Sequence, residues 1–223
     1  MSIKNILVII ALILFILPLA NAQNYIGFNG GYCTGSFMNF SKHKDYEADY
    51  NFKNGYTFSS FYEKKQDSTY NLIIELQYKK QNAEFRVKKN EKYGTFDEID
   101  YSFQHLNLNL IYSFRLIENK TFKLYYTFGM TFSYNINTIA KGYGWDGYTR
   151  SDWKKNEQNS KDLSKFNCGV DSGINLIIPV NDKIDFLFQN RYNMFISNIM
   201  NEKRFRFTSL FTGLLNIGFR YNL

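Results

Sequence analysis

Acidic and basic residues recur at alternate positions in several stretches of the chain, a spacing that places them on one face of a β-sheet. Carboxylates brought together in this way could support acid–base chemistry, because neighbouring charges perturb each other's ionisation. They could equally form ion pairs, since a charge removed from water needs a partner of opposite sign. The residues concerned are Glu75, Lys79, Arg115, Lys123, Asp171, Asp185, Arg191 and Arg220.

Sequence motifs give no support to the catalytic alternative. His43 and His105 are the only histidines, and neither has companions at the spacing of a metal site or a catalytic triad. The sequence has no G-x-S-x-G, P-loop or H-E-x-x-H pattern. We therefore expect no enzymatic activity, no catalytic residues, no cofactor and no metal, and we interpret the eight charged residues as an internal network of ion pairs.

A second group of candidate residues lies in segment 138–164, which contains both tryptophans of the chain. Aromatic rings beside basic residues suit stacking on sugars and contacts to other proteins. The alternative, which we favour, is a folded polar cap over the rim of the molecule, because long surface loops commonly form such caps. The candidate contact residues are Tyr143, Trp145, Tyr148 and Trp153.

The elements that must position both groups are β-strands, because apolar and polar residues alternate with period two from Gln23 onward. The last stretch is the most regular, and only Leu210 and Leu214 interrupt its polar side. The stretches cover residues 26–32, 56–62, 70–78, 106–114, 122–136, 166–178, 184–192 and 205–223.

A change of parity follows the third stretch, where Ala83, Phe85 and Val87 are apolar at the positions that should be polar. We interpret these residues as a bulged extension of the strand, paired with residues 99–103. A separate short hairpin is the alternative.

The connections between the eight stretches alternate in length. Segments 64–68, 117–120 and 179–183 are short, whereas 35–50, 89–98 and 138–164 are long and polar, although 198–202 is again short. Short turns on one side and long loops on the other are typical of bacterial outer-membrane barrels. The sequence thus predicts an all-β fold, an eight-stranded antiparallel up-and-down transmembrane β-barrel formed by residues 23–223. The interior of such a barrel is just wide enough for side chains to fill, which favours a filled barrel over a conducting pore.

The N-terminus predicts export. Lys4 precedes a long apolar stretch that ends in Ala20-Asn21-Ala22, the pattern of a signal-peptide cleavage site. We expect a cleaved signal peptide over residues 1–22 and a protein located in the cell outer membrane. Aromatic residues make up 19% of the chain and only two prolines occur, a balance that favours strands.

Net charge and cysteines restrict the partners further. The charge of +7 comes from 27 basic and 20 acidic residues that are mixed along the chain, so nucleic-acid binding is not expected, whereas anionic lipid or polysaccharide is a plausible partner. Cys33 and Cys168 fall on non-neighbouring strands with opposite facing, which predicts two free thiols. The expected partners are outer-membrane lipid, the barrel assembly machinery and surface polysaccharides or proteins.

The most consistent function is that of a membrane-anchored scaffold or surface-interaction protein that binds through its outer loops. A narrow pore or a component of a secretion apparatus is one alternative. A soluble, lipocalin-like barrel that binds a ligand is another, and it would require the apolar face of the strands to point inward.

Several short motifs resemble the outer-membrane β-barrel domain of Bacteroidetes-type bacteria, often called PorT-like. They are the glycine-rich Tyr25-Ile26-Gly27-Phe28-Asn29-Gly30-Gly31-Tyr32, the Glu75-Leu76-Gln77-Tyr78 run and Leu106-Asn107-Leu108-Asn109-Leu110, in which the family usually has Glu and Pro at positions 107 and 109. The resemblance implies an outer-membrane location and no enzymatic activity. The terminal Tyr221-Asn222-Leu223 likewise resembles the insertion signal that such barrels carry.

Overall fold

Nine β-strands and the turns between them make up the part of the chain that the computed structural model describes, namely residues 24–39, 47–66, 69–90, 95–145, 150–156, 163–197, 199 and 208–223. The expected signal peptide, residues 1–22, lies outside these ranges, as do His43 and Tyr148. None of the described residues forms a helix long and apolar enough to cross a membrane. The strands are β1 (Asn24–Asn39), β2 (Glu47–Lys65), β3 (Tyr70–Asn90), β4 (Thr95–Glu118), β5 (Lys123–Trp145), β6 (Arg150–Asn156), β7 (Phe166–Pro179), β8 (Ile184–Phe195) and β9 (Thr208–Asn222).

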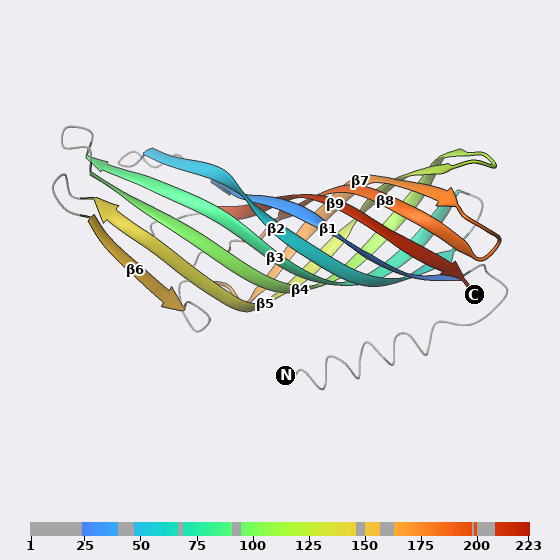
Figure 1. Cartoon of the computed structure of the whole chain (residues 1–223), viewed down its shortest axis with the longest axis horizontal. Helices are drawn as coiled ribbons and strands as arrows, with labels where there is room; N and C mark the ends of the chain where they lie inside the picture. Colours follow the sequence, from blue (N-terminus) through green and yellow to red (C-terminus); the bar gives the residue numbers. More distant parts are fainter. Residues whose placement is uncertain are drawn as a thin grey trace.

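Eight of these strands close into an antiparallel barrel (Figure 1). The order around the barrel is β4, β3, β2, β1, β9, β8, β7 and β5, and the pairing of β5 with β4 completes the ring. The two ends of the chain meet where β1 pairs with β9, from Tyr25 opposite Asn222 to Asn39 opposite Thr208. The predicted eight-stranded up-and-down barrel is therefore confirmed.

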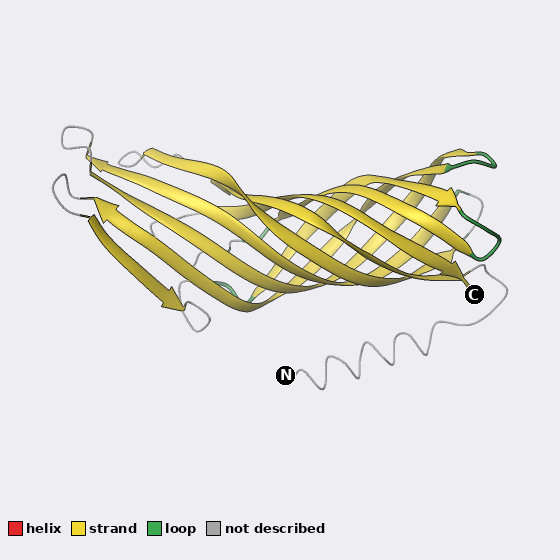
Figure 2. Cartoon of the chain, viewed as in Figure 1, coloured by secondary structure: helices red, strands yellow, loops and turns green. Residues whose placement is uncertain are grey.

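The two ends of the barrel differ (Figure 2). At the end we call the turn end, short turns join β2 to β3, β4 to β5 and β7 to β8. Both ends of the described chain lie there too, because the Leu223 N–H donates to the Asn24 carbonyl at 2.9 Å. At the opposite end, called the loop end, β2 to β6 continue beyond the other strands. We call this continuation, residues 47–52, 84–90, 95–102, 139–145 and 150–156, the extension.

The extension corrects the prediction of a loop over residues 138–164. Strand β5 continues to Trp145, and β6 pairs with it from Trp145 opposite Arg150 to Ile139 opposite Asn156. Likewise, β1 and β2 cover much of the loop expected at 35–50. The reason is that a strand beyond the bilayer has no lipid-facing side, so backbone pairing can continue without the alternation that marks a membrane strand.

The apolar residues of the alternating stretches face outward. Phe28, Met130 and Phe219 are 68, 58 and 58% exposed, whereas the neighbouring Asn29, Thr131 and Arg220 are buried inside the barrel. A lipocalin-like barrel needs the opposite orientation, so this alternative is wrong. The same alternation separates the cysteines, because Cys33 is buried on β1 and Cys168 is exposed on β7, both as free thiols.

Aromatic contacts on the outer surface lie at two levels along β3. Tyr70, at the start of the strand, packs on Tyr112 and Phe114, with ring centroids 6.3 and 6.4 Å apart. Eight residues further along, Tyr78 packs on Tyr56 at 6.3 Å. Aromatic residues on either side of an apolar band are typical of the membrane interfaces of outer-membrane barrels.

The interior consists of two apolar layers with a polar layer between them. The turn-side apolar layer is formed by Phe61, Ile73, Ile111, Tyr125, Ile177 and Leu187. The loop-side apolar layer is formed by Phe37, Ala83, Phe103, Leu163, Phe195, Ile199 and Leu210. We call the inward-facing residues between these two sets the middle layer.

The loop-side apolar layer explains two irregularities of the sequence pattern. Leu210 is apolar on the polar side of its strand because it belongs to this layer. Ala83 also faces inward, so the expected bulge at this point of β3 is wrong. The predicted pairing with residues 99–103 is confirmed for Ala83 and Phe85, whereas Val87 pairs with Asp97. The bulge lies instead in β2, between Phe52 and Tyr56.

Candidate functional site

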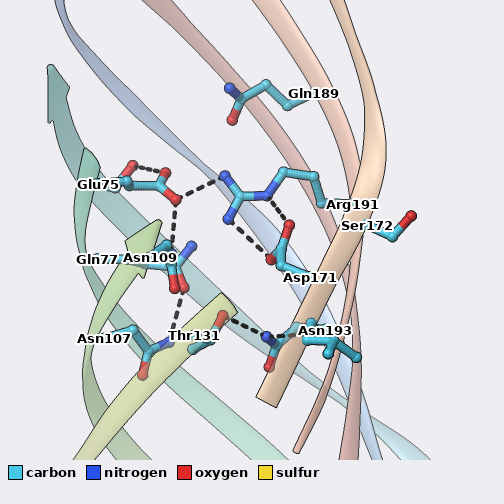
Figure 3. Close-up of polar contacts among 12 residues, drawn as sticks. Glu75, Gln77, Asn107, Asn109, Thr131, Asp171, Ser172, Gln189, Arg191 and Asn193 are labelled. Atoms are coloured by element: carbon cyan, nitrogen blue, oxygen red, sulfur yellow. Dashed lines mark hydrogen bonds and ion pairs between the residues drawn. The ribbon is translucent and has the colours of Figure 1, made fainter. Parts of the chain in front are cut away.

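Arg191 on β8 lies between two carboxylates in the middle layer (Figure 3). Its Nη1 donates to Glu75 Oε2 on β3 at 2.7 Å, and its Nη2 donates to Asp171 Oδ2 on β7 at 3.1 Å. Its Nε lies 3.0 Å from Asp171 Oδ1. All three side chains are almost completely buried. Each buried charge thus has a partner of opposite sign, which offsets the cost of removing it from water.

Glu75 accepts further hydrogen bonds from three other strands. Ser59 Oγ and Asn29 Nδ2 donate to its Oε1 at 2.6 and 3.3 Å, and Asn109 Nδ2 donates to its Oε2 at 2.7 Å. With Arg191, both oxygens of this carboxylate are occupied. A carboxylate engaged in this way cannot readily accept a proton from a substrate, so the arrangement connects strands and offers no general base.

Gly173 makes room for the Arg191 side chain. The two residues are paired across β7 and β8, and a Cβ at position 173 would lie 2.6 Å from Arg191 Cγ. The arginine stem therefore passes over the glycine on its way to Asp171. The site therefore depends on the absence of a side chain at position 173 as well as on the three charges.

Lys79 is the second cation of the middle layer, and it is fully buried. Its Nζ donates to Thr212 Oγ1 at 3.2 Å and to Asn193 Oδ1 at 3.5 Å, and it lies 5.1 Å from the centroid of the Phe195 ring. Among the described residues, no carboxylate lies within ion-pair distance of it. The two cations and the two carboxylates Glu75 and Asp171 nevertheless balance in number, so the middle layer has no formal net charge.

Arg220 is the centre of a separate group at the turn end. Its Nη1 donates to Glu63 Oε2 at 2.8 Å, its Nε donates to Asp185 Oδ2 at 2.7 Å, and its guanidinium lies 4.0 Å from the centroid of the Tyr25 ring. Asn71 Nδ2 donates to the other oxygen of Glu63 at 2.5 Å. The expected network is therefore divided in two by the turn-side apolar layer.

Arg115 and Lys123 do not belong to the interior, which corrects the prediction for these two residues. Both pair with Glu118 beside the turn between β4 and β5, Lys123 at 3.0 Å, and their side chains are 33 and 24% exposed. The register shifts between Arg115 and Ile117, so the alternation that places residues inside the barrel ends before the turn.

The sequence pattern did not single out the uncharged members of the network. His105 is fully buried, its Nδ1 lies 3.2 Å from Ser133 Oγ, and its ring stacks on Phe103. Asn29, Ser59 and Asn109 were also missed as ligands of Glu75. The feature of the sequence that they share is their position on the polar, inward-facing side of their strands. Among the described residues, no cluster of His, Cys, Asp or Glu could hold a metal ion.

Three of the four candidate contact residues lie on strands of the extension. Strand β5 carries Tyr143 and Trp145 at alternate positions, whereas Trp153 on β6 is paired with Gly142, at the other parity of β5. Tyr148 lies outside the described residues. Their role as contact residues stays a prediction.

Comparisons with known proteins give structural neighbours of low sequence identity. No curated protein matches the chain. Among solved structures, it is similar to Neisserial surface protein A (13% identity over 91% of this chain and 99% of that one, TM-score 0.43). It is also similar to OprG of Pseudomonas aeruginosa (14% identity over 91% of this chain and 96% of that one, TM-score 0.49). A third similar structure is the outer membrane protease OmpT of Escherichia coli (10% identity over 90% of this chain and 97% of that one, TM-score 0.46). At these identities and TM-scores the three structures carry no argument about function.

A family model gives the decisive match, and it covers residues 21–201. Those residues include eight of the nine strands, and the closed barrel with its outward apolar face agrees with the match. The chain therefore belongs to the outer membrane protein beta-barrel domain family, and its location is the cell outer membrane.

Proposed function

We propose that this protein is a non-enzymatic scaffold or surface-interaction protein that is anchored in the outer membrane and binds its partners through the loop end. The extension is the observation that carries the proposal. Strands β4 and β5 have 24 and 23 residues, whereas about 9–11 residues suffice to cross a membrane. Roughly half of each strand is thus available as a rigid support beyond the bilayer.

The interior supports anchoring over transport. The ion pairs of Arg191 and the two apolar layers occupy the space that a conduction pathway would need. This weighs against the alternatives of a narrow pore and a secretion component. The occupied oxygens of Glu75 also support the absence of catalysis.

The proposal also covers the export of the protein and its relationship to other barrels. Residues 1–22 act as a cleaved signal peptide, the mature protein begins at Gln23, and the assembly machinery recognises the terminal Tyr221-Asn222-Leu223. The glycine-rich motif at residues 25–32 supports kinship with the PorT-like barrels of Bacteroidetes-type bacteria.

The partner class that we favour is an anionic polysaccharide. The support is local: β6 contains Arg150, Lys154 and Lys155 against the single acid Asp152, whereas the other segments of the extension contain four basic and six acidic residues. Basic residues on an extramembrane strand can attract sulfated or carboxylated polymers. A protein partner is the other outcome of the test.

The test compares two variants that lose the same charge at opposite ends of the barrel. In one, Lys154→Gln and Lys155→Gln alter the extension; in the other, Lys120→Gln and Lys183→Gln alter exposed residues of the turn end. Binding of dextran sulfate to the protein in lipid nanodiscs is measured, with neutral dextran as the reference. We expect the first pair to weaken binding roughly threefold or more, as the loss of two surface charge contacts would, and the second pair to have no effect. Equal effects of both pairs, or no binding by the unmodified protein, would contradict the polysaccharide assignment.

A further inference from the structure

Twelve buried side-chain atoms of the described barrel have no hydrogen-bond partner within the protein. Three of them are Arg191 Nε and Asp171 Oδ1, which lie 3.0 Å apart as an ion pair, and Asn137 Oδ1 on β5. The other nine belong to uncharged inward-facing residues between the two apolar layers. They include both donors, such as Gln77 Nε2 and Asn216 Nδ2, and acceptors, such as Asn175 Oδ1. The atoms are Thr57 Oγ1, Gln77 Nε2, His105 Nε2, Asn107 Oδ1, Asn109 Oδ1, Thr127 Oγ1, Asn175 Oδ1, Asn216 Nδ2 and Asn216 Oδ1.

Such atoms are expensive to bury. A polar group without a partner costs about 1–3 kcal/mol, and native proteins leave only a few of them unsatisfied per 100 residues. Here they are concentrated in one layer of one barrel and come from β2, β3, β4, β5, β7 and β9. Buried water molecules that form two to four hydrogen bonds each satisfy groups of this kind in other proteins.

We propose that the middle layer is a binding site for a cluster of internal water molecules, sealed from the solvent by the two apolar layers. The site holds water and no ion, because Lys79 and Arg191 already balance Glu75 and Asp171. The mixture of unpartnered donors and acceptors also fits a ligand that both donates and accepts, as water does.

The two apolar layers are built to seal the site. In the turn-side layer, six of the eight barrel strands contribute a large side chain, while β1 and β9 carry Gly27 and Gly218. A Cβ at Gly27 would lie 2.2 Å from Phe61 Cζ, so the Phe61 ring covers the space left by the glycine. In the loop-side layer, Leu163 and Ile199 lie outside the barrel strands and pack on strand residues such as Phe103. Their segments are connected, since the Ser164 N–H donates to the Ile199 carbonyl at 2.9 Å.

Nuclear magnetic resonance of the full barrel in lipid nanodiscs tests the proposal. Magnetisation transfer from water to the side-chain amide protons of Gln77 and Asn216 is measured with and without a soluble gadolinium chelate. Asn119 in the exposed turn between β4 and β5 is the matched control for access by the chelate. We expect water cross-peaks at Gln77 and Asn216 that the chelate leaves unchanged, while it strongly attenuates the Asn119 signal.

Two results would overturn the proposal. If Gln77 and Asn216 have no water cross-peaks, the middle layer is dry. If the chelate attenuates them as it does Asn119, the apolar layers do not seal the site. Both results concern the interior alone, so they are independent of whether the extension binds a polysaccharide.

Discussion

Arg191 illustrates how a charge can be placed inside a barrel at tolerable cost. Its guanidinium contacts the carboxylates of Glu75 and Asp171, and the missing side chain at Gly173 lets it reach them. An arginine removed from such a site leaves two carboxylates buried without a counter-charge. The loss should therefore be large, even though the net contribution of an intact buried ion pair is small.

We expect Arg191→Leu to lower the free energy of unfolding by about 3–5 kcal/mol, the range for breaking a buried ion pair. Arg115→Leu is the matched control, because its pair with Glu118 is partly exposed and should cost no more than about 1 kcal/mol. The measurement is denaturant unfolding of both variants in detergent micelles. Equal losses in the two variants would show that Arg191 is not held as the structure indicates.

At the residue scale, parity predicted some of the site and missed the rest. Alternation alone assigned Arg191 and Asp171 to the polar side of their strands, and both lie in the middle layer. It could not tell that alternation stops at Arg115, where the register shifts before the turn. Nor could it pair residues distant in sequence, such as Glu75 and Arg191, because pairing across a barrel interior depends on the stagger of every strand.

At the element scale, the closing strand β9 combines two tasks. It completes the ring by pairing with both β1 and β8, and its last residues fasten the turn end. The Leu223 N–H donates to the Asn24 carbonyl, and the Asn222 N–H donates to the Lys183 carbonyl at 2.8 Å. The sequence predicted this strand because its outward face is apolar along most of its length.

We expect deletion of Tyr221-Asn222-Leu223 to abolish assembly, because it removes both the seam contacts and the terminal motif. Heat-modifiable mobility on gels reports the folded barrel. The control is Lys120→Ala with Thr121→Ala, which changes a turn and leaves the seam intact. A truncated chain that inserts into the outer membrane like the control would show that this account of β9 is wrong.

Within the extension, the hairpin of β5 and β6 was the part least predictable from sequence. Alternation marks a strand when one side faces lipid, and β6 has no such requirement, so segment 138–164 resembled a loop. The barrel should not depend on this hairpin, because β5 pairs with β7 through residues 123–134, below the extension.

We expect a barrel of unchanged stability when residues 141–154 are replaced by Asn-Gly. Ala140 and Lys155 are paired across β5 and β6, so a two-residue turn can join them. Heat-modifiability and denaturant unfolding are measured beside the unmodified protein. A shortened chain that fails to fold would mean that the extension supports the barrel, contrary to its proposed role as a binding platform.

At the scale of the whole molecule, the outer surface faces lipid and the interior is filled. The outward aromatic and aliphatic residues hold the protein in the membrane, while ion pairs and apolar layers fill the barrel. The outer-membrane location and eight-stranded fold followed from alternation and connection lengths. The layering of the interior did not, because apolar inward residues such as Leu210 looked like interruptions of the pattern.

Planar-bilayer conductance of the purified, refolded protein tests the central claim most directly. A barrel filled by the Arg191 ion pairs and closed by two apolar layers should give no steady channel events at any applied voltage that the bilayer tolerates. The refolded state is checked by heat-modifiability of the same preparation. Steady, reproducible channel events from the folded protein would contradict a filled barrel and support a pore.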